Sequence, residues 1–165
     1  MLKKIGGNLF ISMIIIMLFT GCGVNRQDQQ MIVLEKKTVS AMQGENSMEI
    51  TMTSGKTVIE AILEDNETSR QFIARLPMTI RMKRFDDREY YVPIANLSEE
   101  GPKISDYENG DVTYYTGGPS FAVFFAKSGQ SSQGNLIRLG KVISDLSLFE
   151  HWDNEAEVKI EVKRK

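Results

Sequence analysis

The chain has 165 residues, with 20 lysines and arginines against 22 aspartates and glutamates, so its formal net charge is −2. Hydrophobic residues make up 41% and charged residues 25% of the chain, a composition that indicates one globular domain and excludes a collagen-like or wholly disordered protein. A single cysteine, Cys22, excludes a disulfide framework and zinc sites built on paired cysteines. The length excludes a multi-domain enzyme.

The first 21 residues have the three zones of a secretory signal. Lys3 and Lys4 give it a positive start, and an apolar run extends from Leu9 to Phe19. As a helix these 11 residues would be about 16 Å long, whereas the hydrocarbon core of a bilayer is about 30 Å thick. We therefore predict a signal peptide over residues 1–21 and not a membrane-spanning helix.

Small residues precede the cysteine at the end of this signal. The segment Leu18-Phe19-Thr20-Gly21-Cys22 resembles the lipobox of bacterial lipoproteins, in which the cysteine is diacylated and the chain is cut just before it. Phe19 departs from the aliphatic residue that is usual at its position. The resemblance implies lipid attachment at Cys22, and two acyl chains would hold the protein stably on a membrane. The alternative is an ordinary secretory signal with a chance cysteine.

The mature chain would carry 18 basic and 22 acidic residues, a net charge of −4, because Lys3 and Lys4 leave with the signal. It has no basic excess, so we expect no nucleic-acid partner. Residues 22–46 are polar and are predicted to form a flexible tether, followed by one domain over residues 47–165. Within the tether, the apolar run Met31–Leu34 has an alternative to a flexible conformation, namely a short strand or a segment that packs on the domain.

Alternation of apolar and polar residues predicts a hairpin at the start of the domain. Met48, Ile50 and Met52 alternate with polar residues, the pattern of a half-buried strand. Ser54-Gly55 marks a turn, and a second strand is expected over residues 57–63.

A short helix is expected next. Asn66 is a suitable N-cap, because its side chain can accept a bond from a free backbone N–H of the first turn. The helix is predicted over residues 67–75, and Leu76-Pro77 ends it. A third strand is predicted from Met78 to Lys83, followed by a charged, turning segment over residues 84–91.

The second half of the domain consists of short apolar segments separated by loops. Loops are expected over residues 96–109 and 128–135. Residues 121–126 are apolar at every position, as expected of a central strand or a barrel wall. Further strands are expected at residues 111–115, 136–143 and 157–163, with a turn or short helix at 146–149. Seven or eight strands with one helix predict a mainly β barrel or sandwich.

Several short motifs occur in one order along residues 48–162. They are Leu63-Glu64-Asp65-Asn66-Glu67-Thr68, Phe72, Leu76-Pro77-Met78-Thr79, Gly110-Asp111-Val112 with Tyr114, Phe121-Ala122-Val123-Phe124-Phe125 and Leu139-Gly140-Lys141-Val142. In this order the chain resembles the bacterial cyclophilin-like family of small barrel proteins. The resemblance implies a mainly β fold, namely a closed or nearly closed β-barrel with one or two short helices. The family resemblance implies no established function.

The resemblance does not extend to the residues of an isomerase. True cyclophilins are peptidyl-prolyl isomerases whose catalytic strands carry Phe-His-Arg, followed by a Phe and a Gln. The segment Met78–Phe85 supplies Arg and Phe but lacks the His and the Gln spacing. The pocket His of the family aligns near Leu136, and its pocket Trp has no counterpart, because Trp152 lies beyond the corresponding strand. We therefore expect no catalysis, with an atypical isomerase as the alternative.

Two pairs of adjacent tyrosines, at 90–91 and 114–115, suggest a recognition surface. Adjacent residues on a strand point to opposite faces, so one member of each pair should face outward. Exposed aromatic rings beside arginines would form a groove for a peptide or a flat ligand. The residues predicted to form this groove are Arg81, Arg84, Tyr90, Tyr114 and Phe124.

Two acidic clusters and one histidine are the remaining candidates for chemistry. The clusters are Asp86, Asp87 and Glu89, and Asp106, Glu108, Asn109 and Asp111. Neither has the spacing of a twelve-residue Ca²⁺ loop, so both are interpreted as turns and solvated surface. His151 lacks a positioned nucleophile and is interpreted as a surface residue. We expect no metal and no cofactor.

Together these patterns predict an exported lipoprotein. It would be lipid-anchored through Cys22 to the outer face of the bacterial cytoplasmic membrane, on the periplasmic side where two membranes are present. Its domain would bind a peptide segment or small ligand. The alternatives are an atypical prolyl isomerase that assists the folding of exported proteins, and an envelope interaction protein with no small ligand.

Overall fold

The computed structural model describes residues 47–163. The predicted signal, Cys22, the tether and Met31–Leu34 lie outside the described residues, so those predictions stay predictions. Within residues 47–163, no helix has both the length and the apolar character that crossing a membrane requires.

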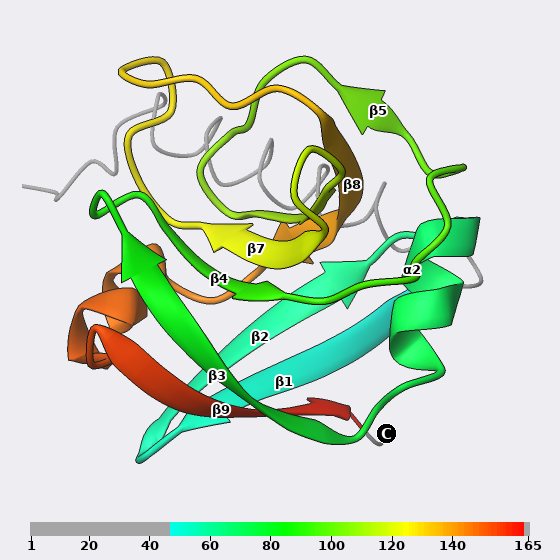
Figure 1. The fold of residues 1–165 in the computed structure, drawn as a ribbon. Coiled ribbons are helices and arrows are strands. Elements are labelled where there is room, and N and C mark those ends of the chain that lie inside the picture. The colour runs from blue at the N-terminus through cyan, green and yellow to red at the C-terminus, as the bar shows by residue number, and fades with distance from the viewer. Residues whose placement is uncertain (1–46, 164–165) are drawn as a thin grey trace, which may run out of the picture.

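Nine antiparallel strands form one continuous sheet, in the order β2-β1-β9-β3-β4-β7-β6-β8-β5. Strand β2 also pairs with β8, which closes a barrel of eight strands and leaves β5 as an addition to β8 (Figure 1). The predicted closed barrel is therefore confirmed. The strands are β1 Met48–Ser54, β2 Thr57–Leu63, β3 Met78–Phe85, β4 Glu89–Pro93, β5 Lys103–Ile104, β6 Asp111–Tyr115, β7 Ser120–Phe124, β8 Leu136–Val142 and β9 Glu155–Val162.

Two short helices lie at opposite ends of the barrel (Figure 1). Helix α2, Glu67–Ile73, begins where the side chain of Asn66 accepts a hydrogen bond from the Ser69 N–H, as its sequence predicts. Its Phe72 is fully buried and stacks on Phe121 with a ring separation of 4.5 Å. The 3₁₀ helix η1, Leu146–His151, contributes Phe149 to the core from the other end.

Strand β7 is buried on both faces, as its apolar sequence predicts. Phe121 and Val123 belong to the main core inside the barrel. Ala122 and Phe124 point the other way and belong to a second, smaller apolar cluster. That cluster exists because the loops before β6 and before β8 cover the outer face of the barrel at this place. Its buried members are Tyr107, Ala122, Phe124 and Leu136.

Strand β4 begins inside residues 84–91, which the sequence predicts to be a charged, turning segment. Asp86 and Asp87 have positive φ angles of 49° and 47°, and the Arg88 N–H donates to the Phe85 carbonyl at 3.0 Å. These features define a tight hairpin turn of the kind that matches the twist of a β-hairpin. The turn takes three residues, Asp86, Asp87 and Arg88, and pairing resumes with Glu89 opposite Phe85.

A candidate ligand pocket on the outer face of the barrel

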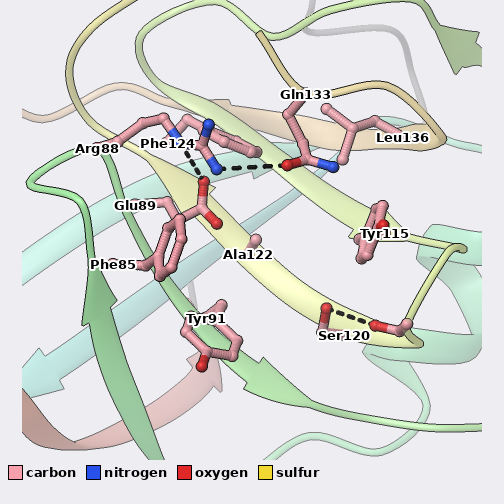
Figure 2. A pocket seen from close by; sticks show the side chains of 11 residues that line it. Phe85, Arg88, Glu89, Tyr91, Tyr115, Ser120, Ala122, Phe124, Gln133 and Leu136 are labelled. Carbon is pink, nitrogen blue, oxygen red and sulfur yellow. Dashed lines mark hydrogen bonds and ion pairs between the residues drawn. The ribbon is translucent and has the colours of Figure 1, made fainter. Parts of the chain in front are cut away.

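A pocket of about 240 Å³ lies on the outer face of the barrel, over β4, β7 and β6 (Figure 2). Sheet register places its central residues on one face, because Glu89 is opposite Phe124, Tyr91 opposite Ala122 and Tyr115 opposite Ser120. The small side chain of Ala122 leaves room between the flanking aromatic rings. The lining residues are Phe85, Arg88, Glu89, Tyr91, Tyr115, Gly118, Ser120, Ala122, Phe124, Gln133 and Leu136.

A buried ion pair forms the polar part of the pocket. Arg88 is 6% exposed and Glu89 is 8% exposed, and the Arg88 Nε donates to Glu89 Oε2 at 2.7 Å. The other nitrogens of Arg88 donate to the carbonyl of Ser132 at 3.4 Å and to Gln133 Oε1 at 3.3 Å. A buried charge requires such partners, because an unpaired one would lose its hydration without compensation.

Aromatic rings surround the guanidinium of Arg88. Its central carbon lies 5.4 Å from the ring centre of Phe85 and 5.5 Å from those of Tyr107 and Phe124. Tyr107 and Phe124 stack on each other at 4.1 Å. Cation–π attraction of this kind is worth about 0.5–2 kcal/mol per contact, more when the cation is desolvated. The rings therefore help to hold Arg88 in one position.

Burial raises the pKa of Glu89 above its ordinary value, because the charged form loses hydration. The neighbouring Arg88 opposes this shift through a hydrogen bond and its charge, and Asp86 adds to it by repulsion. The net effect is that the pKa of Glu89 is raised. Glu89 therefore takes up a proton more readily than an exposed glutamate does, although Arg88 stabilises its charged form.

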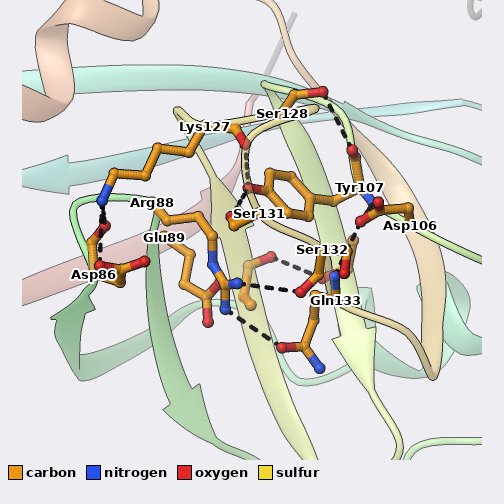
Figure 3. A network of polar contacts seen from close by, with 12 residues as sticks. Asp86, Arg88, Glu89, Asp106, Tyr107, Lys127, Ser128, Ser131, Ser132 and Gln133 are labelled. Atoms are coloured by element: carbon orange, nitrogen blue, oxygen red, sulfur yellow. Dashed lines mark hydrogen bonds and ion pairs between the residues drawn. The ribbon is translucent and has the colours of Figure 1, made fainter.

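The loop of residues 127–135, called here the cover loop, is tied down over one side of the pocket (Figure 3). Tyr107 donates its hydroxyl hydrogen bond to the Lys127 carbonyl at 2.8 Å, and its hydroxyl also lies 2.6 Å from Ser131 Oγ. Gln133 N–H donates to Asp106 Oδ1 at 3.0 Å. Together with the two bonds from Arg88, these contacts bring Gln133 to the pocket.

The expected exposure of Tyr90 and Tyr114 is wrong. Tyr90 is fully buried and Tyr114 is 2% exposed, and both belong to the core inside the barrel. The cause is strand parity: they pair with Val123 and Phe121, which point inward. The Tyr90 hydroxyl donates to the carbonyl of Trp152 at 2.9 Å, so its polar atom is satisfied inside the protein.

The other three predicted groove residues lie in three different places. Arg81 is exposed on β3 and does not line the pocket. Arg84 lies at one end of the barrel, with its guanidinium carbon 4.9 Å from the Phe125 ring centre and its Nε 2.9 Å from Asp87. Only Phe124 lines the pocket. The five residues are therefore not brought together as one groove.

The pocket contains the other tyrosine of each pair. Tyr91 and Tyr115 line the pocket, on the outward positions that alternation allowed for either member. The signal that distinguishes them is in β7, where the small residues Ser120 and Ala122 alternate with large inward ones. No periodicity identifies Arg88, which lies in the turn between β3 and β4.

Of His151 and the two acidic clusters, only Glu89 lines the pocket. His151 is exposed. Among residues 47–163, no group of three or more histidines, cysteines, aspartates or glutamates is arranged to hold a metal ion. The two acidic clusters instead support turns and ion pairs, as where Asp111 accepts from Lys141 at 3.0 Å.

Comparison with known proteins identifies a similar structure and a matching protein family. A solution structure of a hypothetical protein from Archaeoglobus fulgidus is similar, with a TM-score of 0.55, 21% identity and coverage of 71% of this chain and 95% of that one. At this identity the likeness shows the fold alone. No curated protein matches the chain. The model of the cyclophilin-like family matches residues 52–161, well over half of the chain, and the protein therefore belongs to the cyclophilin-like family.

Proposed function

We propose that this protein is a membrane-anchored lipoprotein whose cyclophilin-like domain binds a peptide segment or small ligand, without catalysis. The observation that carries the proposal is the pocket over β7, which combines aromatic walls with a few converging polar groups. Binding sites for small molecules and side chains commonly have this composition. The lipid anchor at Cys22 would place the pocket at the outer surface of the membrane.

A second candidate is an atypical prolyl isomerase, and one observation favours it. Arg88 lies over the rings of Phe85, Tyr107 and Phe124, so a basic group does stand above an aromatic pocket. Binding without catalysis is preferred because three nitrogens of Arg88 already donate to Glu89, Ser132 and Gln133. A group held in this way has to exchange partners before it can act on a bound peptide.

The test is an NMR amide titration of the isotope-labelled full chain in detergent micelles, with a pool of proline-containing peptides. We expect shifts clustered at Tyr91, Tyr115 and Ser120, without faster cis–trans exchange of the peptides. Tyr91→Ala removes one wall of the pocket and should weaken binding about tenfold. Arg81→Ala, which changes an exposed side chain outside the pocket, should leave the affinity unchanged.

Two results would contradict this proposal. Accelerated cis–trans exchange would make the protein an isomerase. Binding that Arg81→Ala weakens and Tyr91→Ala does not would move the site away from the pocket.

A further inference from the structure

We infer that the pocket selects a flat, uncharged ring that carries a hydrogen-bond donor, such as an indole N–H or a phenol O–H, and that Glu89 accepts this bond. The inference rests on the proposed function and specifies the chemistry of the ligand. It depends on three features of the pocket, namely its size and walls, the free side of Glu89, and its charge balance.

The size and walls of the pocket indicate one ring. Its volume of about 240 Å³ is below the roughly 300–1,000 Å³ of sites that enclose a drug-sized ligand, so one side-chain-sized group fits. Tyr91 and Tyr115 stand on either side of the small floor residue Ala122 (Figure 2). A slot between aromatic rings favours a flat group, because planar rings gain contact by stacking or by edge-to-face packing.

Glu89 has one carboxylate oxygen directed into this space. Its Oε2 accepts from Arg88, while the second oxygen points away from Arg88 toward the space above Ala122 (Figure 2). Glu89 is 8% exposed, so a ligand that fills the pocket removes the water available to that oxygen. A buried acceptor left without a donor is costly, and a ligand donor removes that cost. The geometry therefore favours binding of a ring that carries an N–H or O–H group.

The charge balance of the pocket favours an uncharged ligand. Arg88 and Glu89 are the two charged residues of the lining, and they neutralise each other at 2.7 Å. A ligand carboxylate would meet the Glu89 carboxylate, and a ligand cation would meet the guanidinium of Arg88. Either ion would also lose its hydration in the pocket without gaining an uncompensated partner.

The experiment compares three indole probes on the full wild-type chain in detergent micelles, by the same NMR titration. N-acetyl-tryptophanamide carries the donor. Its 1-methyl analogue has the same ring without the N–H, and its 5-methyl analogue adds the same bulk and keeps the N–H. We expect the 1-methyl analogue to bind about tenfold more weakly than the 5-methyl analogue, because only the former leaves Glu89 without a donor.

Two further measurements sharpen the comparison. In E89Q the acceptor is an uncharged amide, and hydrogen bonds to neutral groups are weaker than those to charged groups, so the tenfold difference should shrink to a few-fold. Indole-3-acetate, which carries a carboxylate, should bind at least tenfold more weakly than indole-3-acetamide. Equal affinity of the 1-methyl and 5-methyl probes, or tighter binding of the acetate, would overturn the inference.

The outcomes separate this inference from the proposed function. If proline-containing peptides shift the pocket resonances and the indole probes do not, the inference fails and the binding function stands. If neither set of probes shifts them, both fail. If the indoles bind with equal affinity whether or not they carry the N–H, the pocket is a binding site and Glu89 does not select its ligand.

Discussion

Glu89 is the carboxyl group of the pocket, and its surroundings raise its pKa. Burial raises its pKa above 4.5, so the folded protein holds this proton more tightly than the unfolded chain does. Its contribution to the free energy of unfolding is therefore fully present below the unfolded pKa and is lost as the pH rises through the folded pKa. We expect the carboxyl carbon of Glu89 to titrate with a midpoint above 4.5 in a ¹³C NMR experiment.

The stability measurement that matches this titration compares the wild type with E89Q. Glu108 and Asp145 have pKa values lowered by hydrogen bonds, from Lys141 and from Ser147 respectively, and they favour the folded state as the pH rises. Subtracting the E89Q curve removes these shared contributions. The difference should decline as the pH rises above about 4.5. A midpoint for Glu89 below 4.5 would show that the ion pair with Arg88 outweighs burial.

At the residue scale, alternation alone could not have selected the pocket residues. The sequence shows that Tyr90 and Tyr91 face opposite sides, but only the pairing of Tyr91 with Ala122 decides which side is the interior. A shift of one residue in register would exchange the two rings. The side that a residue faces depends on strands far away in the sequence, and a single sequence does not contain that pairing.

At the element scale, strong local signals in the sequence were sufficient to predict two strands and the start of a helix. The alternating pattern around Met52 and Ile160 predicted β1 and β9, and the cap at Asn66 predicted the start of α2. Residues 84–91 were predicted as a charged, turning segment, because Arg88 and Glu89 resemble solvated surface residues when their mutual ion pair is unknown. In a sequence, charged residues that bury each other look the same as the charged residues of a solvated loop.

The contact between β2 and β8 depends on Gly140. A Cβ at this position would lie 2.1 Å from the backbone oxygen of Ile62 and 2.7 Å from the Cα of Leu63. Since both are backbone atoms, no side-chain rotation relieves the overlap, and Gly140→Ala should lower the free energy of unfolding by about 3 kcal/mol. Urea unfolding followed through the fluorescence of Trp152, which is buried in the core, measures this loss.

The matched control is Gly134→Ala in the cover loop. There the nearest atom to a new Cβ is the Ser105 carbonyl oxygen at 3.9 Å, an ordinary contact. The free energy of unfolding should change by no more than about 0.5 kcal/mol. Equal effects of the two substitutions would mean that the approach of β2 to β8 does not limit stability.

At the scale of the whole molecule, closure of the barrel joins segments that are distant in the chain. Leu63 pairs with Gly140, and Met52 pairs with Ile160. Local patterns predicted seven or eight strands, and the family resemblance predicted a closed or nearly closed barrel. The order of the strands in the sheet was not predicted. The pocket exists only because this order places β4 beside β7 and β6, with the cover loop tied down by Tyr107 and Arg88.

The proposed location of the molecule depends on one atom outside the barrel, the sulfur of Cys22. Serine has no thiol to acylate, so Cys22→Ser should move the protein from the membrane fraction to the soluble fraction, whereas Thr20→Ser keeps the cysteine and should stay with the membrane. The intact mass of the membrane-bound protein should show two acyl chains on a chain that begins at residue 22, because two chains anchor stably and one does not. Retention of Cys22→Ser in the membrane fraction would contradict the anchor. Membrane attachment of the variant would then require a retained signal segment or a membrane-bound partner. In that case the pocket would still lie near the membrane, but a group other than Cys22 would hold the protein there.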